Sequence, residues 1–76
     1  MKSAMKATKL EVLKFIQKND VIEAMDLVNE FDYTYGSAVV RIHRLEKAKL
    51  VEPLGIRDGA YCLTNEAIRR LEYYDQ

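Results

Sequence analysis

Basic residues recur at helical spacing in the middle of the chain. Arg41, Arg44 and Lys47 follow one another at intervals of three residues. At about 100° per residue, Arg44 and Lys47 fall on one face of a helix and Arg41 on its flank. Arginine and lysine bind phosphates, and arginine can also hold a planar acceptor pair through two parallel hydrogen bonds. The three charges therefore indicate either an anion-binding face or an ordinary solvated helix face.

Patterns typical of catalysis and metal binding are missing from the sequence. The chain has one histidine, His43, and one cysteine, Cys62, so it can form neither a histidine pair for a metal nor an internal disulfide. We interpret His43 as a helix-surface residue and Cys62 as a small apolar filler, with an intermolecular redox role as the alternative for Cys62. A glycine-rich phosphate loop and a nucleophile elbow are also missing. We expect no enzyme, no cofactor and no metal site.

The charges cancel over the whole chain but not along it, since twelve Lys and Arg balance twelve Asp and Glu. Residues 1–19 carry five lysines against one glutamate, and residues 20–32 carry five acids and no base. Residues 33–50 carry four bases against one glutamate, and residues 51–76 carry three arginines against five acids. The electrostatic field at a surface follows this local pattern rather than the sum. A neutral total is therefore compatible with a basic face.

Length and composition indicate one small domain over residues 1–76. Of the 76 residues, 49% are apolar and 32% charged, and that apolar share is too high for a disordered tail. The longest apolar run, residues 60–63, is far shorter than the roughly 18 residues of a membrane span. Residues 1–6 lack the apolar stretch of a signal peptide. We expect a soluble chain in the cytoplasm.

Apolar periodicity and capping residues predict a mainly α fold with a small β-hairpin. Thr8 and Glu11 have the spacing of a capping box, and Thr34 and Thr64 are suited to cap later helices. The expected elements are helices over about 9–18, 22–31 and 35–49, strands over 50–52 and 60–63, and a helix over 65–74. They divide the chain into an N-terminal extension (1–7), a three-helix part (8–49), a hairpin (50–63) and a C-terminal helix (64–76).

This order of elements resembles the winged helix-turn-helix domain of MarR-, ArsR- and PadR-type transcriptional regulators. The resemblance covers about residues 8–74 and is carried by three segments: the turn at 32–34 between two helices, residues 42–52, and residues 59–67. It implies a DNA-binding regulator whose hairpin is the wing. Lys49 stands where the family usually has glycine, so we expect the left-handed turn after the third helix to be replaced by another geometry.

The resemblance implies that the helix over 34–49, including its Thr34 cap, is the recognition helix and lies in the major groove of duplex DNA. The residues expected at DNA are Tyr35, Gly36, Ser37, Val40, Arg41, Arg44 and Lys47, with Arg57 as the single base of the wing. Val40 would suit a thymine methyl, and Arg41 or Arg44 a guanine or a phosphate. Alternatively, the basic residues form a solvated face and Val40 meets another protein.

Self-association is the expected source of additional buried area, because a chain of this length buries only about 60% of its unfolded surface. Interface cores favour tyrosine, and the chain has five tyrosines. The resemblance implies that the last helix forms a homodimer, which would bind a roughly palindromic DNA site. The residues expected at this interface are Ile68, Leu71, Tyr73 and Tyr74. Alternatively, the two terminal tyrosines lie at an ordinary helix end.

Two classes of function follow from the sequence. The resemblance favours a regulator that binds DNA directly, whereas the five acids in residues 20–32 favour a protein-interaction module on the same scaffold. The resemblance implies that part of the second helix lies near the phosphate backbone, and the acids of this segment conflict with that position. Replacing Arg41 and Arg44 would discriminate between these two classes.

Overall fold

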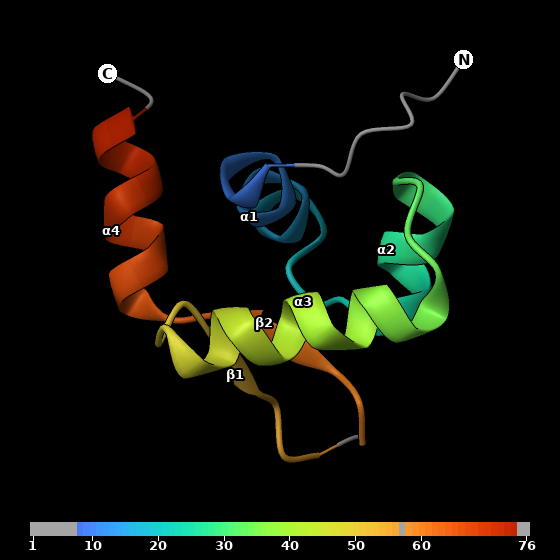
Figure 1. Cartoon of the computed structure of the whole chain (residues 1–76). Helices are drawn as coiled ribbons and strands as arrows, with labels where there is room; N and C mark the ends of the chain where they lie inside the picture. The colour runs from blue at the N-terminus through green and yellow to red at the C-terminus, as the bar shows by residue number, and fades with distance from the viewer. Residues whose placement is uncertain (1–7, 57, 75–76) are drawn as a thin grey trace.

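Four helices and a two-stranded antiparallel hairpin make up the fold, and their order matches the order predicted from the sequence (Figure 1). The computed structural model describes residues 8–56 and 58–74, with the side chain of Tyr74 excepted. The elements are α1 (Lys9–Asn19), α2 (Ala24–Glu30), α3 (Tyr35–Lys47), β1 (Val51–Pro53), β2 (Tyr61–Leu63) and α4 (Asn65–Tyr74). The fold is therefore α+β and mainly helical. Within the described ranges, no helix has the length and apolar character needed to cross a membrane.

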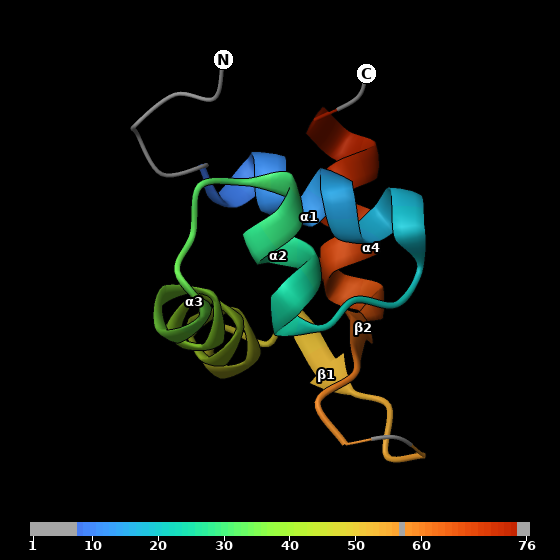
Figure 2. The same cartoon turned by 90° about the vertical axis from the view of Figure 1, so that its right-hand side faces the viewer.

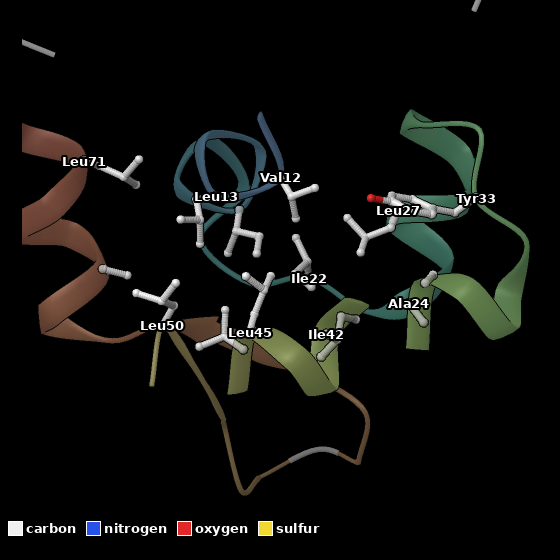
Figure 3. Close-up of a cluster of buried hydrophobic side chains, with 14 residues drawn as sticks. Val12, Leu13, Ile22, Ala24, Leu27, Tyr33, Ile42, Leu45, Leu50 and Leu71 are labelled. Atoms are coloured by element: carbon white, nitrogen blue, oxygen red, sulfur yellow. The ribbon is translucent and has the colours of Figure 1, made fainter. Parts of the chain in front are cut away.

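One hydrophobic cluster holds these elements together (Figure 3). In Figure 1, α1 lies between α4 and α2, and α3 runs below them. The inner face of α1 supplies Val12, Leu13 and Ile16, and α3 meets it with Leu45 among its buried residues. Leu71 of α4 closes the opposite side of the cluster. Each of the four helices and β1 contributes at least one buried side chain to this cluster, so all four helices are part of the core.

The capping box at the start of α1 is present as predicted. The Thr8 hydroxyl accepts a hydrogen bond from the Glu11 backbone N–H at 3.2 Å, and Glu11 Oε1 accepts one from the Thr8 N–H at 2.9 Å. These two bonds satisfy backbone donors that have no partner inside the helix. The pKa of the Glu11 carboxyl is lowered, first by the hydrogen bond from the Thr8 backbone and then by an interaction with the Thr8 side chain. Both interactions favour the charged carboxylate.

The second helix is shorter than the predicted 22–31. Ile22 lies in an isolated antiparallel bridge with Tyr61: each backbone N–H donates to the other residue's carbonyl at 2.9 Å. Extended backbone at Ile22 excludes it from a helix, so α2 begins only at Ala24. Glu23 is its N-cap, and its backbone N–H donates to the Asp26 carboxylate at 2.7 Å in a reciprocal cap. At the other end, Phe31 has extended dihedral angles and is the C-cap.

The expectation that the turn after α3 departs from the left-handed geometry is wrong. Lys49 has φ 67°, and α3 ends at Lys47 rather than at Lys49. The Leu50 N–H donates to the Leu45 carbonyl at 2.9 Å, and the Lys49 N–H donates to the Glu46 carbonyl at 2.9 Å. This pair of bonds is the Schellman pattern, and buried Leu45 and Leu50 supply its apolar contact. The lysine takes this conformation although it costs an L-residue roughly 1–2 kcal/mol.

Thr64 joins the end of this turn to the last helix. Its hydroxyl accepts from the Ala67 N–H at 3.2 Å, as an N-cap of α4, and donates to the Lys49 carbonyl at 2.8 Å. The Thr64 backbone N–H donates to the Leu50 carbonyl at 3.1 Å, next to the pairing of Val51 with Leu63 in the hairpin. One residue therefore connects the turn after α3, the hairpin and α4.

Replacing Thr64 with valine keeps the shape of the side chain but removes both hydroxyl hydrogen bonds. We expect the free energy of unfolding to fall by about 1–2 kcal/mol, whereas Thr64→Ser keeps the hydroxyl and most of the stability. Urea denaturation of the three proteins measures the difference. Equal losses in the serine and valine variants would show that the hydroxyl has no such role.

The lowered pKa of Glu11 predicts a pH dependence with a definite sign. A carboxylate whose pKa is lower in the folded state stabilises the fold above its ordinary pKa and ceases to do so as the pH falls through the lowered value. Glu11→Gln removes this titration. We expect the difference in melting temperature between wild type and variant to be largest at neutral pH and to shrink in acid, as thermal unfolding over a pH series would show. A difference independent of pH would contradict the assignment.

Candidate nucleic-acid interface

One face of α3 is buried in the core and the other is exposed. Its inner residues, Ala38, Ile42 and Leu45, are those expected from a helical period. Figure 2 views α3 nearly along its axis, outside the group formed by α1, α2 and α4. The exposed residues of α3 are Tyr35, Gly36, Val40, His43, Arg44 and Lys47. Its one acidic residue, Glu46, is only half-buried and belongs to neither set.

Five of the expected DNA-facing residues meet in a shallow depression on this outer side. We call it the basic depression; it is lined by Tyr33, Gly36, Ser37, Val40, Arg41 and Arg44. Val40 is 48% exposed, so an aliphatic side chain lies beside two arginines on a solvent-exposed surface. Arginines beside a small apolar patch can bind a phosphate, a planar acceptor pair or a methyl group. The depression thus has the chemistry expected of a surface that meets a polyanion.

The N-terminal turn of α3 is held by its cap. The Thr34 hydroxyl accepts from the Ser37 backbone N–H at 3.2 Å and donates to the Ser37 hydroxyl at 3.1 Å. The cap therefore fixes the Ser37 hydroxyl, which lines the basic depression. Gly36 follows in the same turn, and a Cβ added to it would meet nothing within 4 Å. The fold itself therefore does not require glycine at this position.

The Arg41 side chain is hydrogen-bonded to Tyr33, which is not among the expected DNA-binding residues. Its Nε donates to the Tyr33 hydroxyl at 3.1 Å. The Tyr33 side chain is 6% exposed and its ring packs edge-to-face on Phe31, which packs in the same way on Phe15. Tyr33 precedes α3, so no helical period links it to Arg41. The sequence carries no local signal for this contact.

Tyr35 lies on the other flank of α3, away from the arginines. It lines a groove between α3 and the hairpin, which we call the hairpin groove, together with Met25, His43, Asp58 and Tyr61. Glu23 also lines this groove. The two flanks of α3 therefore differ in charge, because the basic depression has two arginines while the hairpin groove has two acids. Across the part of the chain that the structure describes, no three His, Cys, Asp or Glu side chains are grouped to hold a metal ion.

The remaining expected DNA contacts lie apart from the basic depression. Lys47 is exposed in the last turn of α3, and Arg57 lies outside the described residues. In the acidic segment, the Asp26 carboxylate accepts a hydrogen bond from the Glu23 backbone N–H, so it serves as a cap of α2. Part of the acidic charge that conflicts with DNA binding thus has a local structural role.

Of the four residues expected at a dimer interface, the three whose side chains the structure describes do not form one surface. Leu71 is 0% exposed and belongs to the core, so its assignment to an interface is corrected: the chain's own residues already cover it. Ile68 is 39% exposed and Tyr73 is 75% exposed. At about 100° per residue these two lie about 140° apart around α4. The side chain of Tyr74 lies outside the described residues.

Cys62 is half-buried in β2, paired in register with Glu52 of β1. Burial, and to a smaller extent the charge of Glu52, raise the pKa of the Cys62 thiol. Both causes disfavour the thiolate, which is the reactive form of cysteine. These surroundings agree with a packing role and give a redox role no support.

Comparison of the chain with protein-family models, with curated proteins and with solved structures gives no match. A functional proposal for this chain therefore rests on α3 and its surroundings.

Since Gly36 has open space around its Cβ position, Gly36→Ala is expected to raise the free energy of unfolding by about 0.5–1 kcal/mol. Gly59 is the matched control, because its φ of 81° strains any other residue and Gly59→Ala should destabilise the chain. Urea denaturation measures both effects. A destabilised Gly36→Ala protein would mean that the fold, and not a ligand, requires this glycine.

Proposed function

We propose that the chain is a winged helix-turn-helix transcriptional regulator that binds duplex DNA through α3. In this proposal α2 and α3 form the helix-turn-helix, and the β1–β2 hairpin is the wing. The observation that carries the proposal is the basic depression, where Arg41, Arg44 and Val40 meet on the exposed side of a capped helix. Such a function would associate the chain with the DNA of its cell.

The size of an α-helix is compatible with the proposed place of α3 in the major groove. A helix with its side chains is about 10–12 Å in diameter, and the major groove of B-DNA is about 12 Å wide. With Val40 and Arg44 toward the base edges, the helix would present a methyl contact for thymine and a bidentate donor for guanine. Lys47, exposed in the last turn, would then contact a phosphate.

Two copies on a palindromic site are part of the proposal. The 13 residues of α3 are about 20 Å long, which corresponds to about six base pairs at 3.4 Å each. A site that short recurs by chance many times among the roughly 10⁶ or more competing positions in a genome. Two recognition helices on half-sites one helical turn apart would remove that ambiguity. The surface around exposed Ile68 of α4 is a candidate contact between the copies.

The hairpin groove favours a second candidate function, a protein-interaction module. Tyr35 and Met25 are exposed there beside the acids Glu23 and Asp58. Carboxylates repel a phosphate backbone, whereas exposed aromatic and methionine side chains are typical of protein interfaces. In this alternative a protein partner would occupy the groove and the arginines would be solvated.

The double variant Arg41→Ala/Arg44→Ala distinguishes the two functions. If α3 binds DNA, we expect at least a tenfold loss of affinity for duplex DNA, because a good arginine contact contributes about 1–3 kcal/mol. The slope of log affinity against log salt should also fall by up to about 2 if both arginines meet phosphates. Fluorescence anisotropy over a salt series measures both quantities. Selection from a random pool with the wild-type chain should enrich a palindrome.

Arg69→Ala/Arg70→Ala is the matched control for this experiment. It removes the same charge from α4, where Arg70 forms an exposed ion pair with Glu66 at 2.9 Å. We expect this control to bind DNA nearly as the wild type does. Equal losses in the two double variants would indicate non-specific attraction, and a wild-type chain that binds no DNA at low salt would leave the protein-interaction function.

A further inference from the structure

We propose that Tyr33 is a positioning residue for DNA binding, because its hydroxyl fixes the guanidinium of Arg41 before DNA arrives. This role rests on the proposed function. Tyr33 lies outside α3 and would not contact DNA itself, since it is only 6% exposed and its hydroxyl accepts a hydrogen bond from Arg41 Nε at 3.1 Å.

The position of the Tyr33 hydroxyl is determined by the core. The Phe15 and Phe31 rings lie 5.5 Å apart at 75°, and the Phe31 and Tyr33 rings lie 6.1 Å apart at 77°. Both are edge-to-face contacts of the kind that aromatic pairs prefer. The series begins on α1, passes the end of α2 and ends at the connection to α3. The ring that carries the hydroxyl is therefore buried and packed against residues of two other elements.

A hydrogen bond that orients the side chain in advance favours ligand binding by arginine more than by most residues. A long arginine loses rotamer freedom when it binds, and ordering side chains of this kind weakens binding. A hydrogen bond at Nε restricts the rotation of the plane of the guanidinium, and this plane decides which acceptors the terminal nitrogens can meet. Arg44 is exposed on the outer face and provides the comparison within the same helix.

The two arginines therefore differ in their expected roles. Arg41 is half-buried on the flank of α3, in a fixed orientation beside Ser37 and the capped first turn. A preorganised cation at the edge of a helix is suited to a phosphate, whose contacts set the register of a helix in the groove. Arg44, further from this anchor, is suited to a base edge.

Tyr33→Phe is the sharpest variant, because it keeps the ring and its aromatic contacts and removes only the hydroxyl. We expect its affinity for the DNA selected by the wild type to fall about three- to tenfold, which corresponds to about 0.6–1.4 kcal/mol. The salt slope should stay at the wild-type value, since no charge is lost, whereas Arg41→Ala should lower it by about 1. Tyr61→Phe is the matched control and removes a tyrosine hydroxyl from β2; we expect wild-type affinity.

A double-mutant cycle separates positioning from a merely structural effect. If Tyr33 acts through Arg41, Tyr33→Phe/Arg41→Ala should bind DNA no more weakly than Arg41→Ala alone. Multiplied losses in the double variant, or wild-type affinity of Tyr33→Phe, would overturn the role. Melting temperatures of all variants check that each one is folded at the temperature of the binding assay.

A readout without DNA distinguishes failure of this inference from failure of the proposed function. In a ¹⁵N spectrum of the arginine Nε region, the Arg41 resonance should move in Tyr33→Phe, while that of Arg44 stays in place. If the wild type binds no DNA, the proposed function and this role both fail even when the resonance moves. If the wild type binds DNA and the resonance does not move, only the positioning role fails.

Discussion

The antiparallel bridge between Ile22 and Tyr61 is the constraint on which the arrangement of this small fold depends. Two backbone hydrogen bonds of 2.9 Å join the chain before α2 to the second strand of the hairpin. On its other side Tyr61 pairs with Pro53 of β1. Proline has no backbone N–H to donate, and β1 is an edge strand, where proline is tolerated. Ile22 also buries its side chain in the core. The bridge thus fixes where α2 starts, and so where α3 and its outer face lie.

Local signals predicted most of the helices. Thr8, Thr34 and Thr64 each cap the helix expected after them, because a cap involves only residues within one turn. Contacts between distant residues were beyond such signals. Because Ile22 pairs with Tyr61, α2 begins two residues later than predicted. The residues next to Ile22 carry no signal for a contact with a residue so distant in the sequence.

The turn after α3 shows the limit of a rule based on residue type. Glycine is the usual residue at φ near 60°, and its replacement by Lys49 predicted another geometry. The structure keeps the left-handed turn because Leu45 and Leu50 are both buried beside it and Thr64 holds the Lys49 carbonyl. Burial of two leucines and several hydrogen bonds outweigh the strain of one residue.

The candidate site was predicted in composition but not in geometry. A helical period placed Arg44 on an exposed face and the resemblance added Gly36 and Val40, and the three do lie together in the basic depression. The same period could not tell whether a face is covered by the chain itself or by a second copy, and so Leu71 was assigned to an interface although it is in the core. Periodicity identifies an apolar face of a helix but does not determine which surface packs against that face.

The difference between the two flanks of α3 bears on how the helix would meet DNA. Arg41 and Arg44 lie on one flank, and Glu23 and Asp58 line the groove on the other. Among the described residues, the arginines of the first flank attract a phosphate backbone and the carboxylates of the second repel it, and within a Debye length of about 8–10 Å salt does not remove that difference. If the helix entered a groove, it would roll toward its arginine side. The hairpin would then lie farther from the phosphates than in a docking centred on α3, and the acids beside it would favour that orientation instead of opposing binding.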